Sequence, residues 1–364
     1  MLSPKTKRNI SRIIPFGLIW LLFGLVYALV ERGILGKLDY HPSTGIHYAF
    51  EISLLFAPFY ALVGLIIGTI EVLYLNDLFI NRSFGQKILY KILIYALMNF
   101  VFTVIAFSIG TALELHTNLF DPSVWNRVGI FLTNFAYLSV EIYTALALGV
   151  SLLYFEVSEN IGQGVLRNIF TGKYHRPTKE KRIFMFLDMK SSTTIAEKMG
   201  HVRYFEMLNE YYADLSESII QYSGEIYQYV GDEIIVSWKI KDGIHNTYCI
   251  QCFFAMKKAL KDQADKYLKK FDTVPRCKAG IHLGEVTTGE IGVIKKDIVF
   301  TGDVLNTTAR IQSLCNDYKV DLLISGELVE QLNLNLTYRL KSLGKAELRG
   351  RKENVELFTI LSDE

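Results

Sequence analysis

The sequence predicts a protein of two parts, a bundle of four membrane-spanning α-helices followed by an α+β domain. Hydrophobic residues make up 50% of the 364 residues, and their excess lies in long apolar runs before residue 154. Beyond that point, strand-like and helix-like patterns alternate in a chain of ordinary globular composition. We therefore expect a membrane domain over residues 1–153, a helical connector over 154–181 and a second domain over 182–364.

The membrane-spanning helices are predicted from four apolar runs, at residues 13–30, 52–70, 92–113 and 128–153. Each run is near or above the roughly 18–20 residues that a helix needs to cross ~30 Å of hydrocarbon. The first run could instead belong to a signal peptide. No small-residue cleavage site follows it, however, and three more runs come after it.

The orientation of these spans follows from basic residues, because loops rich in Lys and Arg stay on the cytoplasmic side. Such residues occur in the N-terminal tail and between the second and third runs, as Lys5, Lys7, Arg8, Arg12, Arg82, Lys87 and Lys91. Four spans return the chain to its starting side. We expect a multi-pass protein of the cell (inner or plasma) membrane with both termini in the cytoplasm.

One carboxylate, Glu141, lies inside the fourth apolar run. A charged group within the membrane is costly and is therefore a candidate functional residue. Two interpretations stay open, namely contact with a signal or ligand, and a hydrogen bond to a neighbouring helix.

Two composition features limit the partners of this chain. The net charge of +2 gives no bulk attraction to nucleic acid, so we expect none as a partner. Cys249 and Cys252 have no second cysteine pair at zinc spacing, so we expect buried thiols rather than a metal site.

Residues that typically begin or end helices and strands predict the secondary structure beyond the spans. A helix is expected to continue from the fourth run to about Phe170 and to stop at Gly172. Thr194 and Glu197 suggest a capping box for a short helix that ends at Gly200. Further expected elements are a strand over 182–188, a helix over 204–222, a hairpin over 225–230 and 234–238, a helix over 245–270, strands near 278–281 and 287–289, a helix over 304–315 and terminal strands.

Two aspartates of the second domain are presented in a way that suits cation binding. Asp188 ends an apolar run in the fragment Phe-Leu-Asp-Met, and Asp232 occupies a glycine turn between two strand-like runs. Mg²⁺ takes one or two protein carboxylates and lets phosphates supply its other oxygens. The pair therefore suits two hard divalent cations that grip a triphosphate.

Two further fragments could contact the rest of a nucleotide. Asn306 and Arg310 lie four residues apart, so they share one face of the expected helix and could orient a sugar and meet phosphate charge. Ser191, Ser192 and Thr193 precede a short helix, and helix N-termini bind anions. This turn could hold phosphates beside Asp188.

These fragments, with Ala-Gly-Ile-His-Leu-Gly at residues 279–284 between the second aspartate and the asparagine, resemble the class III nucleotidyl cyclases. Members of that family make cyclic AMP or cyclic GMP, and the resemblance covers roughly residues 182–361. It implies that residues 182–364 form a catalytic domain with a ferredoxin-like core. It also implies two Mg²⁺ (or Mn²⁺) ions per site and a head-to-tail homodimer with two shared sites.

The resemblance assigns a role to each matching residue. Asp188 and Asp232 would hold the cations, helped by the backbone carbonyl of Met189. Asn306 would orient the ribose, and Arg310 would stabilise the charge that develops on the α-phosphate. The implied reaction is attack of the ribose 3′-oxygen on the α-phosphorus, with pyrophosphate as the leaving group.

Arg349 and the two base-selecting positions complete the expected site. Arg349, in the fragment Leu-Arg-Gly-Arg, would contact the terminal phosphates. ATP-using members usually carry Lys with Asp or Thr at the base-selecting positions, and guanylyl cyclases carry Glu with a small residue. This chain has Gln228 and Val299 there.

The base therefore has to be inferred from hydrogen-bonding capacity. The Gln228 amide can accept from the adenine amino group and donate to adenine N1, but it could rotate to serve guanine. Val299 offers no hydrogen bond, which leaves the additional polar groups of guanine poorly satisfied. We expect ATP as the substrate and keep GTP as the alternative.

A non-enzymatic alternative is a membrane receptor whose cyclase-like domain only binds nucleotide or a partner. The four chemical groups of the implied site argue against it, because Asp188, Asp232, Asn306 and Arg310 are all present.

Overall fold

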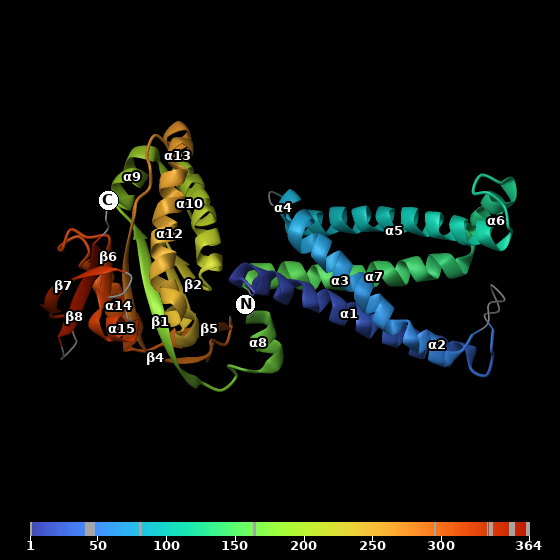
Figure 1. Cartoon of the computed structure of the whole chain (residues 1–364), viewed down its shortest axis with the longest axis horizontal. Coiled ribbons are helices and arrows are strands. Elements are labelled where there is room, and N and C mark those ends of the chain that lie inside the picture. The colour runs from blue at the N-terminus through green and yellow to red at the C-terminus, as the bar shows by residue number, and fades with distance from the viewer. Residues whose placement is uncertain are drawn as a thin grey trace. The chain divides into compact units, whose positions relative to one another are not determined.

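The computed structural model describes residues 2–40, 48–79, 82–162, 165–294, 296–332, 334, 338–348 and 354–361. They form two compact units (Figure 1). The helical unit comprises Lys7–Arg167, and the second, mainly sheet-containing unit comprises Asn168–Glu364 together with Met1–Thr6. The three-part division into residues 1–153, 154–181 and 182–364 stays a prediction.

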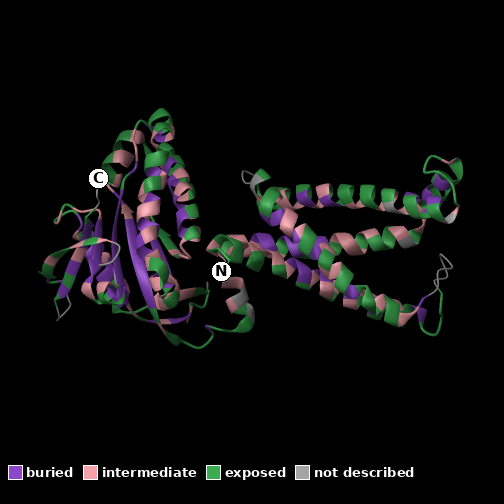
Figure 2. Ribbon diagram, viewed as in Figure 1, coloured by how far each residue is buried: buried purple, intermediate pink, exposed green. Residues whose placement is uncertain are grey.

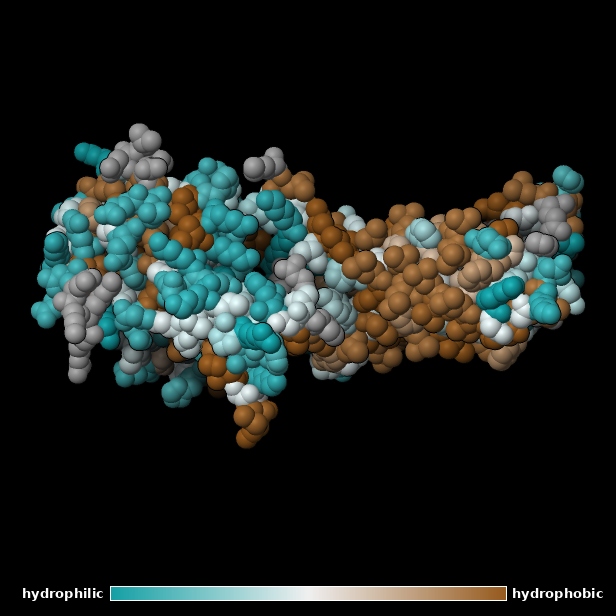
Figure 3. Space-filling model, turned by 90° about the horizontal axis from the view of Figure 1, so that it is seen from below, coloured by the Kyte–Doolittle hydropathy of each residue, from teal (hydrophilic) through white to brown (hydrophobic). Residues whose placement is uncertain are grey.

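In the described part of the helical unit, four helices are long and apolar enough to cross a membrane: Pro4–Leu35, Phe50–Leu75, Phe84–Leu113 and Tyr137–Ile161. Apolar side chains cover the face of this unit that Figure 3 shows, whereas hydrophilic side chains predominate on the second unit. The elements are α1 (Pro4–Leu35), α2 (Phe50–Leu55), α3 (Ala57–Ile70), the π-helical η1 (Glu71–Leu75), α4 (Asn76–Leu78), α5 (Phe84–Glu114), α6 (Pro122–Thr133) and α7 (Phe135–Ile161).

Glycines let α1 and α3 approach each other closely. A Cβ atom on Gly64 would lie 2.7 Å from Cβ of Trp20, and one on Gly68 would lie 2.9 Å from the Phe16 ring. Phe16 and Trp20 are buried and belong to a cluster that also contains residues of α5 and α7. Small residues at such crossings allow backbones to pack tightly where no water drives association.

The fourth predicted span was placed wrongly at its start. Residues 128–133 belong to α6, and Asn134 has an extended backbone with ψ 137°, which separates α6 from α7. The apolar pattern is continuous across this break, so composition alone could not locate it. The helix that is long enough to span therefore begins at Tyr137.

The single connector helix that we predicted is also wrong, because two helices occur there. α7 ends at Ile161, Gly162 has a φ of +104°, and α8 (Val165–Thr171) follows. A positive φ is readily adopted by glycine and interrupts the helix. α8 does end before Gly172, whose φ of +64° terminates it as expected.

Glu141 is engaged by a neighbouring helix. The Asn99 amide of α5 lies 2.9 Å from both carboxylate oxygens of Glu141 on α7. Of our two interpretations, this contact favours the hydrogen bond between helices.

The second unit is built on one eight-stranded sheet in the order β2-β3-β1-β4-β6-β8-β7, with β5 paired to β4. Among the strand pairs that the structure describes, only β4 and β6 run parallel. The strands are β1 (Thr178–Met189), β2 (Glu225–Val230), β3 (Glu233–Lys239), β4 (Cys277–Ile291), β5 (Asp297–Thr301), β6 (Leu322–Ser325), β7 (Arg339–Ala346) and β8 (Val355–Leu361).

Helices cover both faces of this sheet, and α10 and α12 lie side by side over one of them (Figure 1). The succession β1-α10-β2-β3-α12-β4, with the sheet order β4-β1-β3-β2, is a ferredoxin-like arrangement. The helices are α9 (Ser192–Met199), α10 (His201–Gln221), α11 (Ile240–Ile244), the 3₁₀-helical η2 (His245–Thr247), α12 (Tyr248–Asp262), α13 (Ala264–Phe271), α14 (Asp303–Ser313) and α15 (Gly326–Leu332).

β1 is buried inside the second unit, and its side chains contribute to two hydrophobic cores (Figure 2). Its side chains alternate, because successive residues of a strand point to opposite faces. Ile183 and Met185 join the large cluster that includes α10 and α12. Phe184 and Phe186 join a second cluster with Val304 of α14. All four cysteines are buried and free, and the burial of Cys249 and Cys252 agrees with the prediction.

Two predicted boundaries in this unit are wrong. The helix expected over 245–270 is divided into η2, α12 and α13, with Gln263 between the last two. The two strands expected near 278–281 and 287–289 form one strand, β4. Pairing explains its length, since β1 bonds along most of β4 and β5 bonds along its end.

Candidate active site

The structure brings Asp188 and Asp232 together at one edge of the sheet. Asp188 lies near the end of β1, and Asp232 lies in the turn between β2 and β3. β1 and β3 pair up to Leu187 and Ile234, so the chain positions just beyond this pair are neighbours. Burial, together with hydrogen bonding to Asp232 and its negative charge, raises the pKa of Asp188.

Asp232 contributes an unsatisfied acceptor to this pair. Its Oδ2 atom is buried and has no hydrogen-bond partner among the residues that the structure describes. A buried acceptor without a partner is costly, and a cation would satisfy it. The donor set consists of hard carboxylate oxygens, which fits Mg²⁺ or Mn²⁺.

Two side chains that the sequence analysis missed hold the Asp188 carboxylate. Lys278 Nζ lies 3.3 Å from Asp188 Oδ2, and Gln312 Nε2 donates to the same oxygen over 3.1 Å. Lys278 stands opposite Asp188 in the β1–β4 register. Its position therefore depends on strand pairing, which no local motif reveals.

A third carboxylate, Glu233, was also missed. It opens β3 directly after Asp232, and its place in the sequence could have indicated it. Burial and the negative charges of Asp188 and Asp232 raise its pKa to about 7, although Lys278 opposes this shift. Glu233 therefore lies within electrostatic reach of both aspartates and of the Lys278 ammonium group.

Tyrosines of α10 support the Asp232 turn. The Tyr212 hydroxyl donates a hydrogen bond to the carbonyl of Gly231. Burial and the charge of Asp232 raise the pKa values of both Tyr204 and Tyr212 to about 12, so both hydroxyls stay protonated at neutral pH.

The predicted phosphate-binding turn lies shortly after Asp188. Ser191 has a φ of +58° and precedes α9, which starts at Ser192. Ser191 and Thr193 are exposed, whereas Ser192 is partly buried. The capping box that we predicted is wrong, because the helix begins two residues before Thr194 and Ser191 occupies the N-cap position.

Asn306 and Arg310 lie one turn apart on α14. Asn306 is exposed and Arg310 is partly buried, with an Nη1 atom that is buried and unpartnered within the described part of the chain. Neither residue forms a hydrogen bond or ion pair with Asp188 or Asp232 in the regions described. The structure therefore groups the two aspartates, and it shows no direct bond from Asn306 or Arg310 to them within the described residues.

Two glycines of β4 set the position of α14. A Cβ atom on Gly280 would lie 2.5 Å from the backbone nitrogen of Gln312, and one on Gly284 would lie 2.9 Å from Val304. Only residues without a side chain permit this approach. The glycines of the Ala-Gly-Ile-His-Leu-Gly fragment thus allow α14 to pack directly on the strand.

The predicted base-selecting residues come from two strands. Gln228 is exposed on β2, where the register with β3 shifts between Ile226 and Gln228. Val299 is partly buried on β5. The residues next to them join β2 to β5, because the backbone N–H of Phe300 donates to the Tyr227 hydroxyl over 3.3 Å.

Two of the predicted site residues, Met189 and Arg349, take part in none of the contacts described above. Arg349 lies outside the described residues, so its role stays a prediction. Met189 is described, and its side chain is buried in the core with 1% exposure. Only its backbone carbonyl could serve as the predicted ligand.

Comparisons with known proteins identify the family of this chain. The family model for the adenylate and guanylate cyclase catalytic domain matches residues 175–362 of the sequence. Because that match covers more than half of the chain, the chain belongs to the adenylate and guanylate cyclase family.

Individual relatives are similar over part of their length. Adenylate cyclase 2 of Rhizobium meliloti (strain 1021) is 32% identical over 223 residues, which make up 61% of this chain and 61% of that protein. Adenylate cyclase of Anabaena cylindrica is 28% identical over 183 residues, or 48% of this chain and 36% of that one. The chain thus spans about three fifths and about one third of these relatives.

A solved structure also resembles this chain. It belongs to a bacterial light-regulated adenylyl cyclase and has a TM-score of 0.51 at 18% identity, covering 60% of this chain and 64% of that one. At such low identity the likeness establishes the fold alone.

Proposed function

We propose that this protein is a membrane-anchored nucleotidyl cyclase that converts ATP into 3′,5′-cyclic AMP and pyrophosphate. One observation carries the proposal. Asp188 and Asp232, which are far apart in sequence, meet at one sheet edge, and a buried oxygen of Asp232 has no hydrogen-bond partner within the described residues.

ATP is favoured over GTP for two reasons. The similar proteins from Rhizobium meliloti and Anabaena cylindrica are both named adenylate cyclases. Gln228 is exposed, so its amide is free to present both a donor and an acceptor to adenine. GTP remains the second candidate because the same amide could rotate.

The chain's own groups supply binding and electrostatic stabilisation. Asp188 and Asp232 would hold the divalent cations, which when bound stabilise charge on the reacting oxygens. The turn at Ser191–Thr193 would bind phosphates through backbone N–H groups. Asn306 would orient the ribose, and Arg310 would stabilise the charge that develops on the α-phosphate.

A homodimer is proposed because one chain does not unite all these groups. A helix turns about 100° per residue, so Arg310 and Gln312 leave α14 on nearly opposite sides. Gln312 contacts Asp188, hence Arg310 is directed away from the aspartates of its own chain. Val293 and Ile294 add exposed apolar surface, with 95% and 104% relative exposure, which a second copy could cover.

The membrane anchor is proposed from the four apolar helices and from the basic residues near their ends. Lys87 and Lys91, which we expected in a loop, lie inside α5. With four spans, both termini would lie in the cytoplasm, where nucleoside triphosphates are found.

The test is to incubate the purified full chain with ATP or GTP, with Mg²⁺ or Mn²⁺, and to identify any cyclic product. Asp188→Ala and Asp232→Ala should each reduce the rate by more than about tenfold, which corresponds to ~1.4 kcal/mol of barrier stabilisation. Asp262→Ala, which removes an exposed carboxylate at the end of α12, serves as the matched control.

Two results would contradict the proposal. A correctly folded wild-type protein that makes no cyclic nucleotide would favour the inactive receptor. Retention of more than about a tenth of the activity in either aspartate variant would remove the metal-binding assignment.

A further inference from the structure

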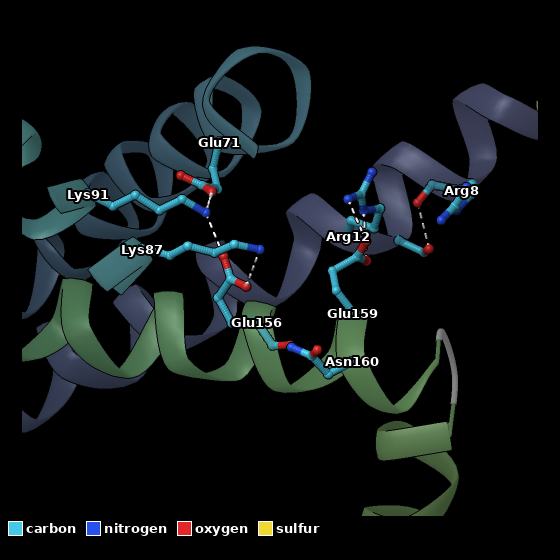
Figure 4. Close-up of polar contacts among 9 residues, drawn as sticks. Arg8, Arg12, Glu71, Lys87, Lys91, Glu156, Glu159 and Asn160 are labelled. Carbon is cyan, nitrogen blue, oxygen red and sulfur yellow. Dashed lines mark hydrogen bonds and ion pairs between the residues drawn. The ribbon is translucent and has the colours of Figure 1, made fainter. Parts of the chain in front are cut away.

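A network of charged residues is buried inside the helical unit. Lys91 of α5 and Glu71, the first residue of η1, are both fully buried, and Glu156 of α7 is 3% exposed. Lys91 Nζ lies 2.5 Å from a Glu71 oxygen and 2.6 Å from a Glu156 oxygen (Figure 4). One ammonium group thus joins three of the four long helices. We call these three residues the Lys91 network.

Neighbouring groups balance the charge of the Lys91 network. The second oxygen of Glu156 lies 3.8 Å from Lys87 Nζ, and the Tyr95 hydroxyl donates to Glu71 over 3.2 Å. Two carboxylates therefore face two ammonium groups. Such buried ion pairs rarely add stability compared with apolar residues, but removing one partner leaves a buried charge uncompensated.

The remaining long helix is attached to α7 one turn further on. Arg12 of α1 forms an ion pair of 2.8 Å with Glu159. The buried ring of Phe155 lies between the two sets of charges, with Arg12 Cζ 5.2 Å and Lys91 Nζ 5.7 Å from its centroid. Contacts from α1 and α5 therefore converge on three neighbouring residues of α7, and η1 is linked to them through Lys91.

The backbone at Glu71 is also unusual. α3 changes there from an α-helix to a π-helical turn that extends to Leu75. π-helical turns are rare and often occur at functional sites.

The place of these contacts along α7 gives them a consequence for the second unit. α7 ends at Ile161, and the chain then leads through α8 to β1, which carries Asp188. We propose that the Lys91 network fixes the position of α7 in the bundle and thereby sets the output of the cyclase domain. The regulatory part of this inference rests on the proposed cyclase function.

The test measures helix spacing and activity in the full chain reconstituted in lipid vesicles. Nitroxide labels at Leu89→Cys on α5 and Leu153→Cys on α7 report the spacing, because both side chains are exposed and the native cysteines are buried. Lys91→Met and Glu156→Gln should each shift the mean spacing by about 2 Å or broaden its distribution. Each should also change the rate of cyclic nucleotide formation by about threefold or more.

Two control variants separate the network from general effects of substitution. Lys91→Arg retains the positive charge and should keep both spacing and activity near the wild-type values. Glu51→Gln alters an exposed carboxylate of α2 and should change neither. If a single variant fails to insert, the neutral triple variant Glu71→Gln/Lys91→Met/Glu156→Gln leaves no buried charge and should show the broadened spacing.

Either of two results overturns the inference. The first is an unchanged spacing in Lys91→Met, Glu156→Gln and the triple variant. The second is a changed spacing with activity that stays within about 1.5-fold of wild type. A wild-type chain without cyclase activity would instead contradict the proposed function, and with it the regulatory part, while the spacing would still decide whether the network positions α7.

Discussion

Gln312 and Arg310 leave α14 on opposite sides of the helix, although only one residue separates them. Gln312 reaches the Asp188 carboxylate of its own chain, and a helical rotation of about 100° per residue carries Arg310 away from it. The partly buried Arg310 also has an Nη1 atom without a hydrogen-bond partner in the described regions. The two side chains therefore have different surroundings.

This geometry predicts that two defective chains can repair each other. Asp188→Ala and Arg310→Ala proteins should each be inactive alone, because each lacks a group of every site. A mixture should regain activity, since one of the two sites in a mixed dimer would contain both groups. Product formation after mixing, with subunit exchange verified by labelled chains, measures the effect.

A mixture of Asp188→Ala with Asp232→Ala protein is the matched control. Both changes affect the aspartate half of the site, so no mixed dimer would contain an intact site and activity should stay low. Recovery in that control, or no recovery in the first mixture, would indicate a site contained in one chain.

The choice of base should depend on Gln228. Gln228→Glu should lower activity with ATP and raise the relative use of GTP, because a carboxylate only accepts hydrogen bonds and suits guanine N1–H. Gln228→Lys should preserve ATP use, since an ammonium group donates to adenine N1. A matched polar pair contributes roughly 1–3 kcal/mol in a desolvated site, so the ATP-to-GTP ratio of kcat/KM should move about tenfold or more. An unchanged ratio in both variants would mean that Gln228 does not contact the base.

Close packing of α14 on β4 should make Gly280 intolerant of a side chain. Gly280→Ala would place Cβ 2.5 Å from a backbone nitrogen of α14, and overpacking of this kind costs about 1–3 kcal/mol. Gly289→Ala, on the same strand, would meet its nearest atom only at 3.4 Å and should be far milder. Thermal unfolding of the two variants compares these effects, and equal midpoints would contradict the packing argument.

The ion pair that Asp321 forms beside the end of β1 should weaken at acidic pH. Burial opposes the ionisation of Asp321, but ion pairs with Lys190 and Lys257 outweigh it and lower the Asp321 pKa. Because the folded-state pKa is depressed, this contribution to stability is present above the unfolded pKa, roughly 3.9, and is lost as the pH falls through the folded pKa.

Asp321→Asn should therefore unfold at a lower temperature than wild type at pH 7, by an amount equivalent to about 1 kcal/mol or less, since the pair is partly exposed. The difference should shrink as the pH is lowered below about 4. A gap that stays constant across this range would assign the effect to packing instead of charge.

The sequence was sufficient for features that depend on local pattern. Apolar runs predicted the four long helices and the central strand, and short fragments singled out Asp188 and Asp232. Features that depend on pairing were missed. Lys278 faces Asp188 only because β1 and β4 pair in that register. β4 seemed to be two strands because a polar interruption hides the pairing that supports its full length.

Interruptions of helices inside apolar stretches could not be predicted from the sequence either. Asn134 lies within a hydrophobic run, and its extended backbone separates α6 from α7. The π-helical turn at Glu71 has no composition signal either. Such breaks depend on tertiary contacts, which override local propensity.

The pairing of β1 also determines when the site can exist during synthesis. β1 bonds to β3 and β4, and Lys278, which contacts Asp188, leaves the ribosome long after Asp188 does. Contacts between residues so distant in the chain form slowly, because a long loop must first close. A nascent chain would thus carry all its apolar helices before its two aspartates acquire their neighbours. Catalytic competence would be among the last properties that the growing polypeptide gains.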